Sequence, residues 1–148
     1  MFKSSVSKSI RNSRGMTLIE IMIVIAIIAG LMAVLGTTAF KYLKDSRIST
    51  TKIQMKTIGQ ALEGYNLACN SYPTTDQGLD ALTDKPAGDV CANWGPEAYL
   101  KKGQKLDPWK RPFIYESDGS TFELKSYAED KKEGGEGYAK DILYSEIE

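Results

Sequence analysis

The sequence predicts an α+β protein, in which one long N-terminal α-helix packs on a small antiparallel β-sheet. Three observations lead to this fold class. Residues 21–40 carry no charge, residues 41–67 continue with apolar side chains at helical spacing, and residues 112–127 contain two strand-like runs around Asp118-Gly119. A helix followed by a separate group of strands is typical of α+β proteins.

The first fifteen residues are basic, serine-rich and without periodicity. They hold Lys3, Lys8, Arg11 and Arg14 and no acidic residue, a charge of +4, whereas the remaining 133 residues carry 15 basic and 19 acidic side chains, or −4. Basic residues mark the cytoplasmic side of a membrane helix. We therefore expect residues 1–15 to be a cytoplasmic leader.

The uncharged stretch at residues 21–40 is long enough to cross a membrane. Its 20 residues would span about 30 Å as a helix, the hydrocarbon thickness of a bilayer. A secretory signal has a shorter apolar region that ends in small residues, whereas the small residues here lie in the middle of the run. These residues are Ala26, Ala29, Gly30 and Ala33. We expect a permanent single span, with the N-terminus in the cytoplasm and the C-terminal domain outside.

The helical pattern continues beyond the membrane stretch. Apolar residues recur at steps of 7, 3, 4 and 3, which places them on one face of a helix. They are Ile48, Met55, Ile58, Leu62 and Tyr65. Gly59 and Gly64 weaken the helix locally, and the cluster at residues 69–71 before Pro73 ends it. One continuous helix is thus predicted from about residue 17 to 67.

The chain after this helix is rich in turn-forming residues. Thr74 and Gln77 fit a capping box that opens a short helix. This helix is predicted to end near Thr83, before Pro86. Residues 84–108 are predicted to be a loop.

Two strands and an acidic tail complete the chain. The runs at 112–116 and 121–127 predict a β-hairpin, and Asp107-Pro108 predicts a turn ahead of it. The final stretch, EDKKEGGEGYAKDILYSEIE, is acidic and contains glycine, with too few apolar residues to pack alone. Either it is disordered or its carboxylates bind a ligand.

Several function classes lose support from what the sequence lacks. The chain has no histidine, which excludes Ser-His-Asp and Cys-His catalysis and imidazole-ligated zinc. Paired carboxylates or a lysine could serve an enzyme, but no spacing argues for them. There is also no glycine-rich phosphate loop, no CxxC pair and no basic–aromatic patch suited to nucleic acid. We expect neither an enzyme nor a nucleic-acid-binding protein.

The two cysteines, Cys69 and Cys91, lie beyond the apolar stretch. If this part of the chain is exported, a disulfide is expected, worth about 3 kcal/mol by the loop-entropy estimate. The alternative is two buried free thiols. The aromatic side chains are expected to pack in the core rather than to bind a ligand. These are Tyr65, Tyr72, Trp94, Tyr99, Trp109 and Tyr115.

The N-terminal stretch RGMTLIEIMIVIAIIAGLMAVLG resembles the N-terminus of type IV pilin-like proteins. The resemblance consists of a basic leader, a glycine, a hydrophobic first mature residue, then Thr, Leu, Ile and Glu. The segments YPTTDQGLDALTDKP, YLKKGQKLDPWKRPFIYES and SYAEDKKEGGEGYAKDI are similar to major pseudopilins of type II secretion systems. The resemblance covers nearly the whole chain and implies the type IV pilin-like fold.

The resemblance also implies processing at the start of the apolar helix. Prepilin peptidase would cut between Gly15 and Met16 and methylate the new amine of Met16. A carboxylate in lipid costs about 2.5–3.5 kcal/mol, so Glu20 calls for a partner. The Met16 amine of another subunit would supply it and set the stagger of a filament. The alternative is that Glu20 reaches the lipid headgroups.

A C-terminal calcium-type loop is a further implication of the resemblance. Asp130 and Asp141 align with the acidic positions of that loop, and carbonyls near Tyr127 would complete the shell. Glu133 and Glu136 are additional candidate ligands. Hard oxygen ligands of this kind suit Ca²⁺. The alternative is a solvated charge run held by packing.

The expected protein is therefore a structural assembly subunit. Residues 1–15 would be removed, residues 16–40 would anchor and polymerise, and residues 41–148 would form a periplasmic domain. The implied product is a pseudopilus, a helical homo-oligomer that helps to move folded exoproteins across the outer membrane. Implied partners are prepilin peptidase, minor pseudopilins and the inner-membrane assembly platform. The alternatives are a type IV pilus major pilin for adhesion or twitching, and a single-span periplasmic binding protein that never polymerises.

Overall fold

The computed structural model describes residues 15–147. Residues 1–14, which are all of the expected leader except Gly15, and residue 148 lie outside the described residues. The chain divides into two units, with the boundary between Phe40 and Lys41.

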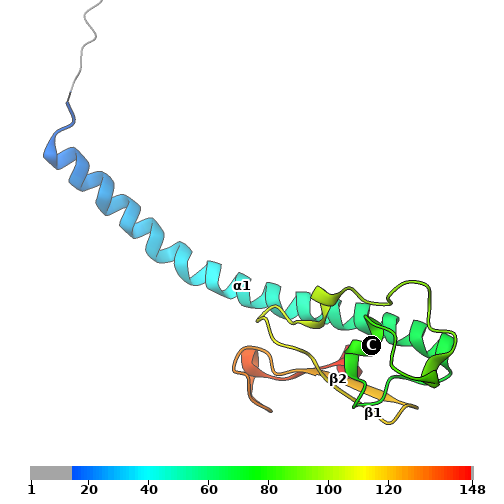
Figure 1. The fold of residues 1–148 in the computed structure, drawn as a ribbon. Helices are drawn as coiled ribbons and strands as arrows, with labels where there is room; N and C mark the ends of the chain where they lie inside the picture. The colour runs from blue at the N-terminus through cyan, green and yellow to red at the C-terminus, as the bar shows by residue number, and fades with distance from the viewer. Residues whose placement is uncertain (1–14, 148) are drawn as a thin grey trace, which may run out of the picture. The chain divides into compact units, whose positions relative to one another are not determined.

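The long predicted helix is present as α1, Leu18–Cys69, with 52 residues (Figure 1). In the first unit its large apolar side chains are exposed, among them Leu18, Ile25 and Leu31. The same helix contains a stretch that is long and apolar enough to cross a membrane. No buried core residue precedes Thr51, so this apolar surface contributes nothing to the core of the described chain.

In the second unit α1 supplies one side of the core. Met55, Ile58 and Leu62 are fully buried and Ile48 is partly buried, which confirms the predicted apolar face. Thr51 fills the gap between Ile48 and Met55 and is also fully buried. Its hydroxyl donates to the Arg47 carbonyl at 2.8 Å, which satisfies the hydroxyl inside the core.

The other side of the core is a three-stranded antiparallel sheet in the order β1-β2-β3. Strand β1 is Ile114–Ser117, β2 is Phe122–Ser126 and β3 is Ile142–Leu143. The register pairs Tyr115 with Leu124, and both side chains are buried. The hairpin is confirmed with shorter strands, because Pro112 lies in an isolated bridge with Leu106 ahead of β1.

Two expectations for the remaining segments need correction. The short helix predicted from Thr74 is a turn followed by a 3-10 helix, Gly78–Leu82. Gln77 does accept a hydrogen bond from the Thr74 N–H at 2.8 Å. However, Gly78 has a φ of +57°, which interrupts an α-helix.

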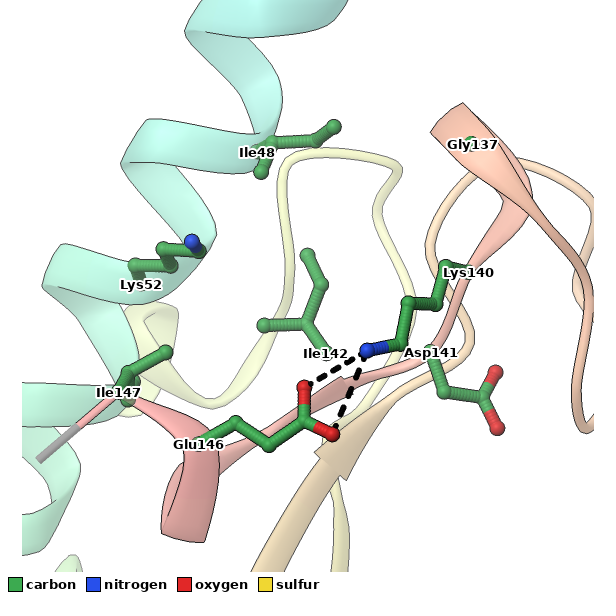
Figure 2. A pocket seen from close by; sticks show the side chains of 8 residues that line it. All are labelled: Ile48, Lys52, Gly137, Lys140, Asp141, Ile142, Glu146 and Ile147. Carbon is green, nitrogen blue, oxygen red and sulfur yellow. Dashed lines mark hydrogen bonds and ion pairs between the residues drawn. The ribbon is translucent and has the colours of Figure 1, made fainter.

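For the acidic tail, where the sequence left disorder and ligand binding open, the disordered alternative is wrong, because the tail is folded on the core. Strand β3 pairs with β2, and Ile142 is 6% exposed. Tyr144 and Ile147 pack against the same core. In Figure 2, Ile142 and Ile147 face the side of α1 that carries Ile48.

The aromatic residues pack in the core as expected, and the two cysteines form the expected disulfide rather than free thiols. Tyr65 and Trp94 both make edge-on contacts with Tyr99, with ring centroids 5.9 and 5.6 Å apart. A disulfide joins Cys69 to Cys91, with the Cα atoms 4.9 Å apart. It ties the end of α1 to the following loop.

Candidate functional site

The predicted processing and assembly residues lie at the start of α1. Met16 is 62% exposed. The Glu20 N–H donates to Thr17 Oγ1 at 3.3 Å, and the Thr17 N–H donates to Glu20 Oε2 at 3.4 Å. This reciprocal arrangement is a capping box. Sequence reasoning missed it, although a threonine three residues before a glutamate is its signal.

The segment at residues 127–141, which we call the C-terminal loop, is tightly coiled. Five of its residues have left-handed backbone angles: Ala128, Lys131, Gly134, Gly135 and Gly137. A Cβ on Gly135 would lie 2.9 Å from the carbonyl carbon of Ala139, so only glycine fits there. The loop therefore depends on backbone geometry that few residues adopt at low cost.

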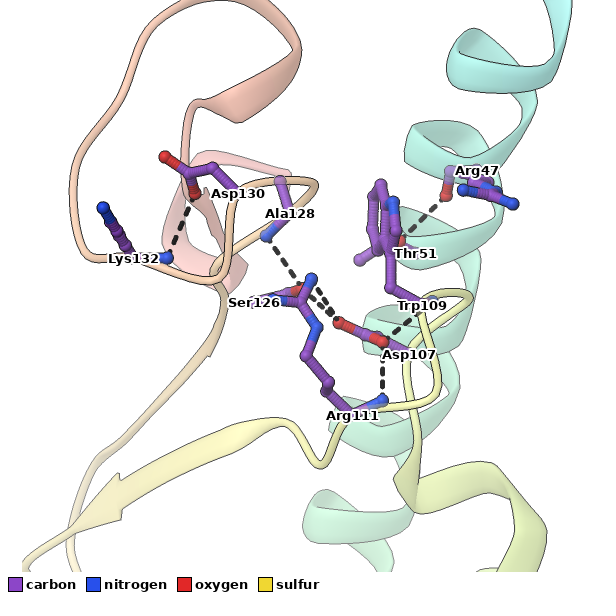
Figure 3. Close-up of polar contacts among 9 residues, drawn as sticks. All are labelled: Arg47, Thr51, Asp107, Trp109, Arg111, Ser126, Ala128, Asp130 and Lys132. Atoms are coloured by element: carbon purple, nitrogen blue, oxygen red, sulfur yellow. Dashed lines mark hydrogen bonds and ion pairs between the residues drawn. The ribbon is translucent and has the colours of Figure 1, made fainter.

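The two aspartates predicted as metal ligands both have roles inside this loop. Asp130 Oδ1 accepts from the Lys132 N–H at 3.1 Å (Figure 3). Asp141 Oδ2 accepts from the Gly134 N–H at 2.9 Å. The other oxygen, Asp141 Oδ1, is buried and has no hydrogen-bond partner among the described residues. A buried carboxylate oxygen without a donor is costly and indicates a missing partner.

The other predicted ligands have different contacts. Glu133 Oε1 lies 3.3 Å from Lys125 Nζ, and this hydrogen bond raises the pKa of Lys125. The Tyr127 ring centroid lies 6.0 Å from the same ammonium. Glu136 precedes a short 3-10 helix, Gly137–Ala139. Within residues 15–147 no three acidic, cysteine or histidine side chains are grouped to hold a metal, so a metal here would need backbone carbonyls.

Helix α1 holds the C-terminal loop through two consecutive residues. Lys44 Nζ lies 2.9 Å from Glu129 Oε2 and 5.3 Å from the centroid of the Tyr138 ring. A hydrogen bond to Asp45 raises the pKa of the Tyr138 hydroxyl. Sequence reasoning missed these contacts, because charged residues on the polar side of a helix carry no signal for a distant partner.

Asp107 organises the entry to the same loop, as Figure 3 shows. Its Oδ1 accepts the backbone N–H groups of Trp109 and Arg111, both at 2.9 Å, which confirms the predicted turn. Its Oδ2 accepts the Ser126 hydroxyl at 3.0 Å, and the Ala128 N–H lies 3.4 Å from Ser126 Oγ. Asp107 thus links its own turn to the end of β2. Its burial and its reach to Ser126 were not foreseen.

The exposed apolar start of α1 and the compact α+β unit define a class of protein. Residues 10–36 match the motif described as the prokaryotic N-terminal methylation motif. The fold is similar to a crystal structure of the major pseudopilin from the type 2 secretion system of enterohaemorrhagic Escherichia coli. The TM-score is 0.57 and the identity 24%, over 70% of this chain and 90% of that one. The class is that of pilin-like proteins that carry a methylation motif.

Sequence comparison narrows this class to one family. Residues 38–145 match the family described as type II secretion system, protein G. The type II secretion system core protein G of Pseudomonas aeruginosa is 38% identical over 135 residues, which is 89% of this chain and 94% of the relative. The same protein of Vibrio cholerae is 36% identical over 140 residues, which is 91% and 93% of the two chains. The chain belongs to this family.

Proposed function

We propose that this protein is the main structural subunit of the pseudopilus of a type II secretion system. The subunits would assemble into a helical filament in the periplasm that helps to drive folded exoproteins across the outer membrane. The observation that carries the proposal is an apolar helix surface that the chain's own core leaves exposed. Such a surface needs lipid or other helices to cover it. The proposal assigns the chain a structural role and no catalysis.

The proposal includes a route from membrane to filament. The precursor would span the inner membrane once, with its N-terminus in the cytoplasm and residues 41–148 in the periplasm. Prepilin peptidase would cut between Gly15 and Met16 and methylate Met16. Cleavage leaves a positive amine four residues from Glu20, and an amine of this kind on a neighbouring subunit would compensate the carboxylate in lipid. Minor pseudopilins and an inner-membrane platform are the expected assembly partners.

Processing is tested in the source bacterium with Gly15→Ala and assembly with Glu20→Ala, and Gly103→Ala is the control. We expect both test variants to abolish secretion and assembly, and the control to retain them. Mass spectrometry of the wild-type protein should show a chain that begins at N-methylated Met16. Wild-type secretion by either test variant, or an intact Met1 terminus, would contradict the proposal.

Electron microscopy separates the two alternatives. Long surface pili at native expression would favour a type IV pilus major pilin. A protein that is processed but never polymerises would favour a single-span periplasmic binding protein. Short filaments that depend on the secretion apparatus are the result expected here.

A calcium ion in the C-terminal loop is the second part of the proposal. Asp130 and Asp141 would hold it together with backbone carbonyls near Tyr127, and oxygen ligands of these types suit Ca²⁺. The unpartnered Asp141 Oδ1 supports this assignment. Glu133 would have to leave Lys125 to join, and Glu136 remains a candidate. When bound, the ion would neutralise carboxylates and order the loop.

Limited proteolysis of the purified full chain in detergent tests the calcium assignment. With CaCl₂ we expect slower cleavage within the C-terminal loop than with EGTA. Asp141→Asn should remove the difference, whereas Asp76→Asn, on an exposed turn, should retain it. Equal cleavage rates of the wild-type protein with CaCl₂ and EGTA would refute the site.

A further inference from the structure

A groove runs between α1 and the C-terminal segment of the second unit. One cavity of about 200 Å³ is lined by Ile48, Lys52 and Ile147, among others (Figure 2). An adjoining hollow of about 430 Å³ shares Lys52 and Ile147 and adds Ile53 and Lys56. We call these five residues the basic groove.

The charges of the groove are only partly balanced. Glu146 accepts two hydrogen bonds from Lys140, at 3.1 and 3.3 Å. The Asp141 carboxylate points away from Lys52 in Figure 2. Lys52 and Lys56 form no ion pair with any residue between 15 and 147. The groove thus presents two free ammonium groups beside exposed Ile53, which is 64% accessible.

The opposite charge gathers at the turn of the β1-β2 hairpin. A hollow of about 710 Å³ there is lined by Glu116, Asp118, Phe122 and Glu123, among others. We call these four residues the acidic end. The register places Glu116 directly opposite Glu123, and like charges in this arrangement destabilise a sheet. Hydrogen bonds from the backbone N–H groups of Thr121 and Ser120 lower the pKa of Asp118, so it is ionised at neutral pH.

No carboxylate of the acidic end lies within ion-pair distance of a cation in the described part of the chain. The nearest basic strand residue, Lys125, is bound to Glu133 instead. Each surface places an apolar side chain beside charges that lack an ion-pair partner: Lys52 and Lys56 in the groove, where Glu146 is paired with Lys140, and carboxylates at the acidic end. This is the complementarity that selects a partner and fixes its orientation.

The hairpin turn, which carries Glu116 and Asp118, and the basic groove lie at different heights along α1. Glu123 lies closer to the groove, because its Oε1 accepts from the Tyr144 N–H at 3.0 Å. The hairpin turn lies near the chain just after α1, because the Tyr72 N–H donates to the Gly119 carbonyl at 2.9 Å. The basic groove lies at residues 48–56 of α1. The end of α1 at Cys69 is thirteen to twenty-one residues further on, which corresponds to about 20–30 Å of helix.

We propose that the acidic end of one subunit docks in the basic groove of a second copy displaced along the helix direction. A contact between two different surfaces of identical chains is heterologous and builds an open helical array when the rotation does not close. This inference rests on the proposed filament and adds the contact that sets the axial order of the periplasmic domains.

Charge reversal with rescue tests the contact in assembled filaments. We expect Lys52→Glu with Lys56→Glu to reduce the amount of filament at least about tenfold, because it places like charges together. Glu116→Lys with Asp118→Lys should reduce it similarly. The chain that carries all four changes should regain filaments. The matched control, Lys85→Glu with Glu97→Lys, reverses exposed charges elsewhere and should assemble normally.

Two further measurements keep the test decisive. A thermal melt of each variant identifies a folding defect. If a reversed variant does not fold, Lys52→Met with Lys56→Met should still weaken assembly and reduce its sensitivity to salt. If all of these variants form as many filaments as the wild type, this contact alone is overturned. Absence of wild-type filaments would overturn the proposed function as well.

Discussion

Gly59 shows how a single missing side chain positions the C-terminal segment. A Cβ built on Gly59 would lie 2.6 Å from the ring of Tyr144. Tyr144 in turn packs on Phe122 with centroids 5.2 Å apart, so its ring has little room to retreat. The glycine that weakens the helix is therefore the residue that lets the tail approach it.

Gly59→Ala is expected to lower the free energy of unfolding. Alanine gains about 1 kcal/mol in helix propensity, but overpacking costs about 1–3 kcal/mol, and the clash with Tyr144 should prevail. Urea denaturation measures the balance. At Gly64 the corresponding Cβ would lie 3.3 Å from Tyr99, so Gly64→Ala should be nearly neutral. Gly103, with nothing within 4 Å, provides the control. Equal stability of all three variants would contradict the close packing at Gly59.

The buried hydroxyl of Tyr115 leads us to expect that the folded protein loses stability at alkaline pH. This hydroxyl donates to the Pro73 carbonyl at 2.7 Å, and burial raises its pKa from 10.0 to about 12. Since the folded state holds the proton more tightly than the unfolded state, this contribution is complete below pH 10 and is lost as the pH rises to 12. The loss should reach about 2–3 kcal/mol.

The alkaline prediction is tested by thermal melts between pH 9 and about 12. Tyr115→Phe should be less stable at neutral pH by about 1 kcal/mol, because it loses a hydrogen bond, but should show a shallower alkaline slope. Tyr42→Phe changes a tyrosine that is 70% exposed and should follow the wild type. A slope unchanged by Tyr115→Phe would assign the alkaline loss to other groups.

At the scale of elements, the disulfide is the clearest source of stability outside the core. It closes a segment with a sequence separation of 22 between Cys69 and Cys91. Removing it with Cys69→Ser and Cys91→Ser together should cost about 3 kcal/mol, because the unfolded chain regains loop entropy. Urea denaturation of the double variant measures the cost, and reduced wild-type protein should match it. A difference below about 1 kcal/mol would mean that native strain offsets the entropy gain.

The elements differ in how far sequence could predict them. Helix α1 was predictable because an uncharged run and a regular apolar face follow one another without interruption. The hairpin was predictable because Asp118-Gly119 separates two apolar runs. Strand β3 was not, because Ile142 and Leu143 lie in an acidic stretch and are held by β2 residues far away in sequence. Local pattern does not report such long-range contacts.

The candidate site likewise combines residues that the sequence predicts with contacts that it does not predict. Gly15, Met16 and Glu20 belong to a local motif, and their positions follow from the sequence. The contacts of Asp107 with Ser126 and of Lys44 with Glu129 join segments 19 and 85 residues apart. Neither pair has a spacing that identifies it. Only the fold brings these groups together.

For the whole molecule, the location of the core predicts that residues 41–148 fold alone. Among the residues whose burial the structure describes, every buried core residue lies at Thr51 or beyond, and the unit boundary falls before Lys41. In one detergent buffer, a chain of residues 41–148 should therefore melt cooperatively at the same midpoint as the full chain. Circular dichroism during heating measures this midpoint.

A deeper truncation makes the comparison discriminating. A chain that begins at residue 52 loses Lys44, which binds Glu129, together with the partly buried Ile48 and the buried Thr51. It should melt several degrees lower, since about 1–3 kcal/mol is lost for each buried side chain removed. If the chain of residues 41–148 already melts at a lower midpoint than the full chain, the apolar start of α1 stabilises the second unit. Equal midpoints of the full chain and of residues 41–148 would mean that the apolar start of α1 has no role in folding. Its apolar side chains would then be available to lipid and to neighbouring subunits.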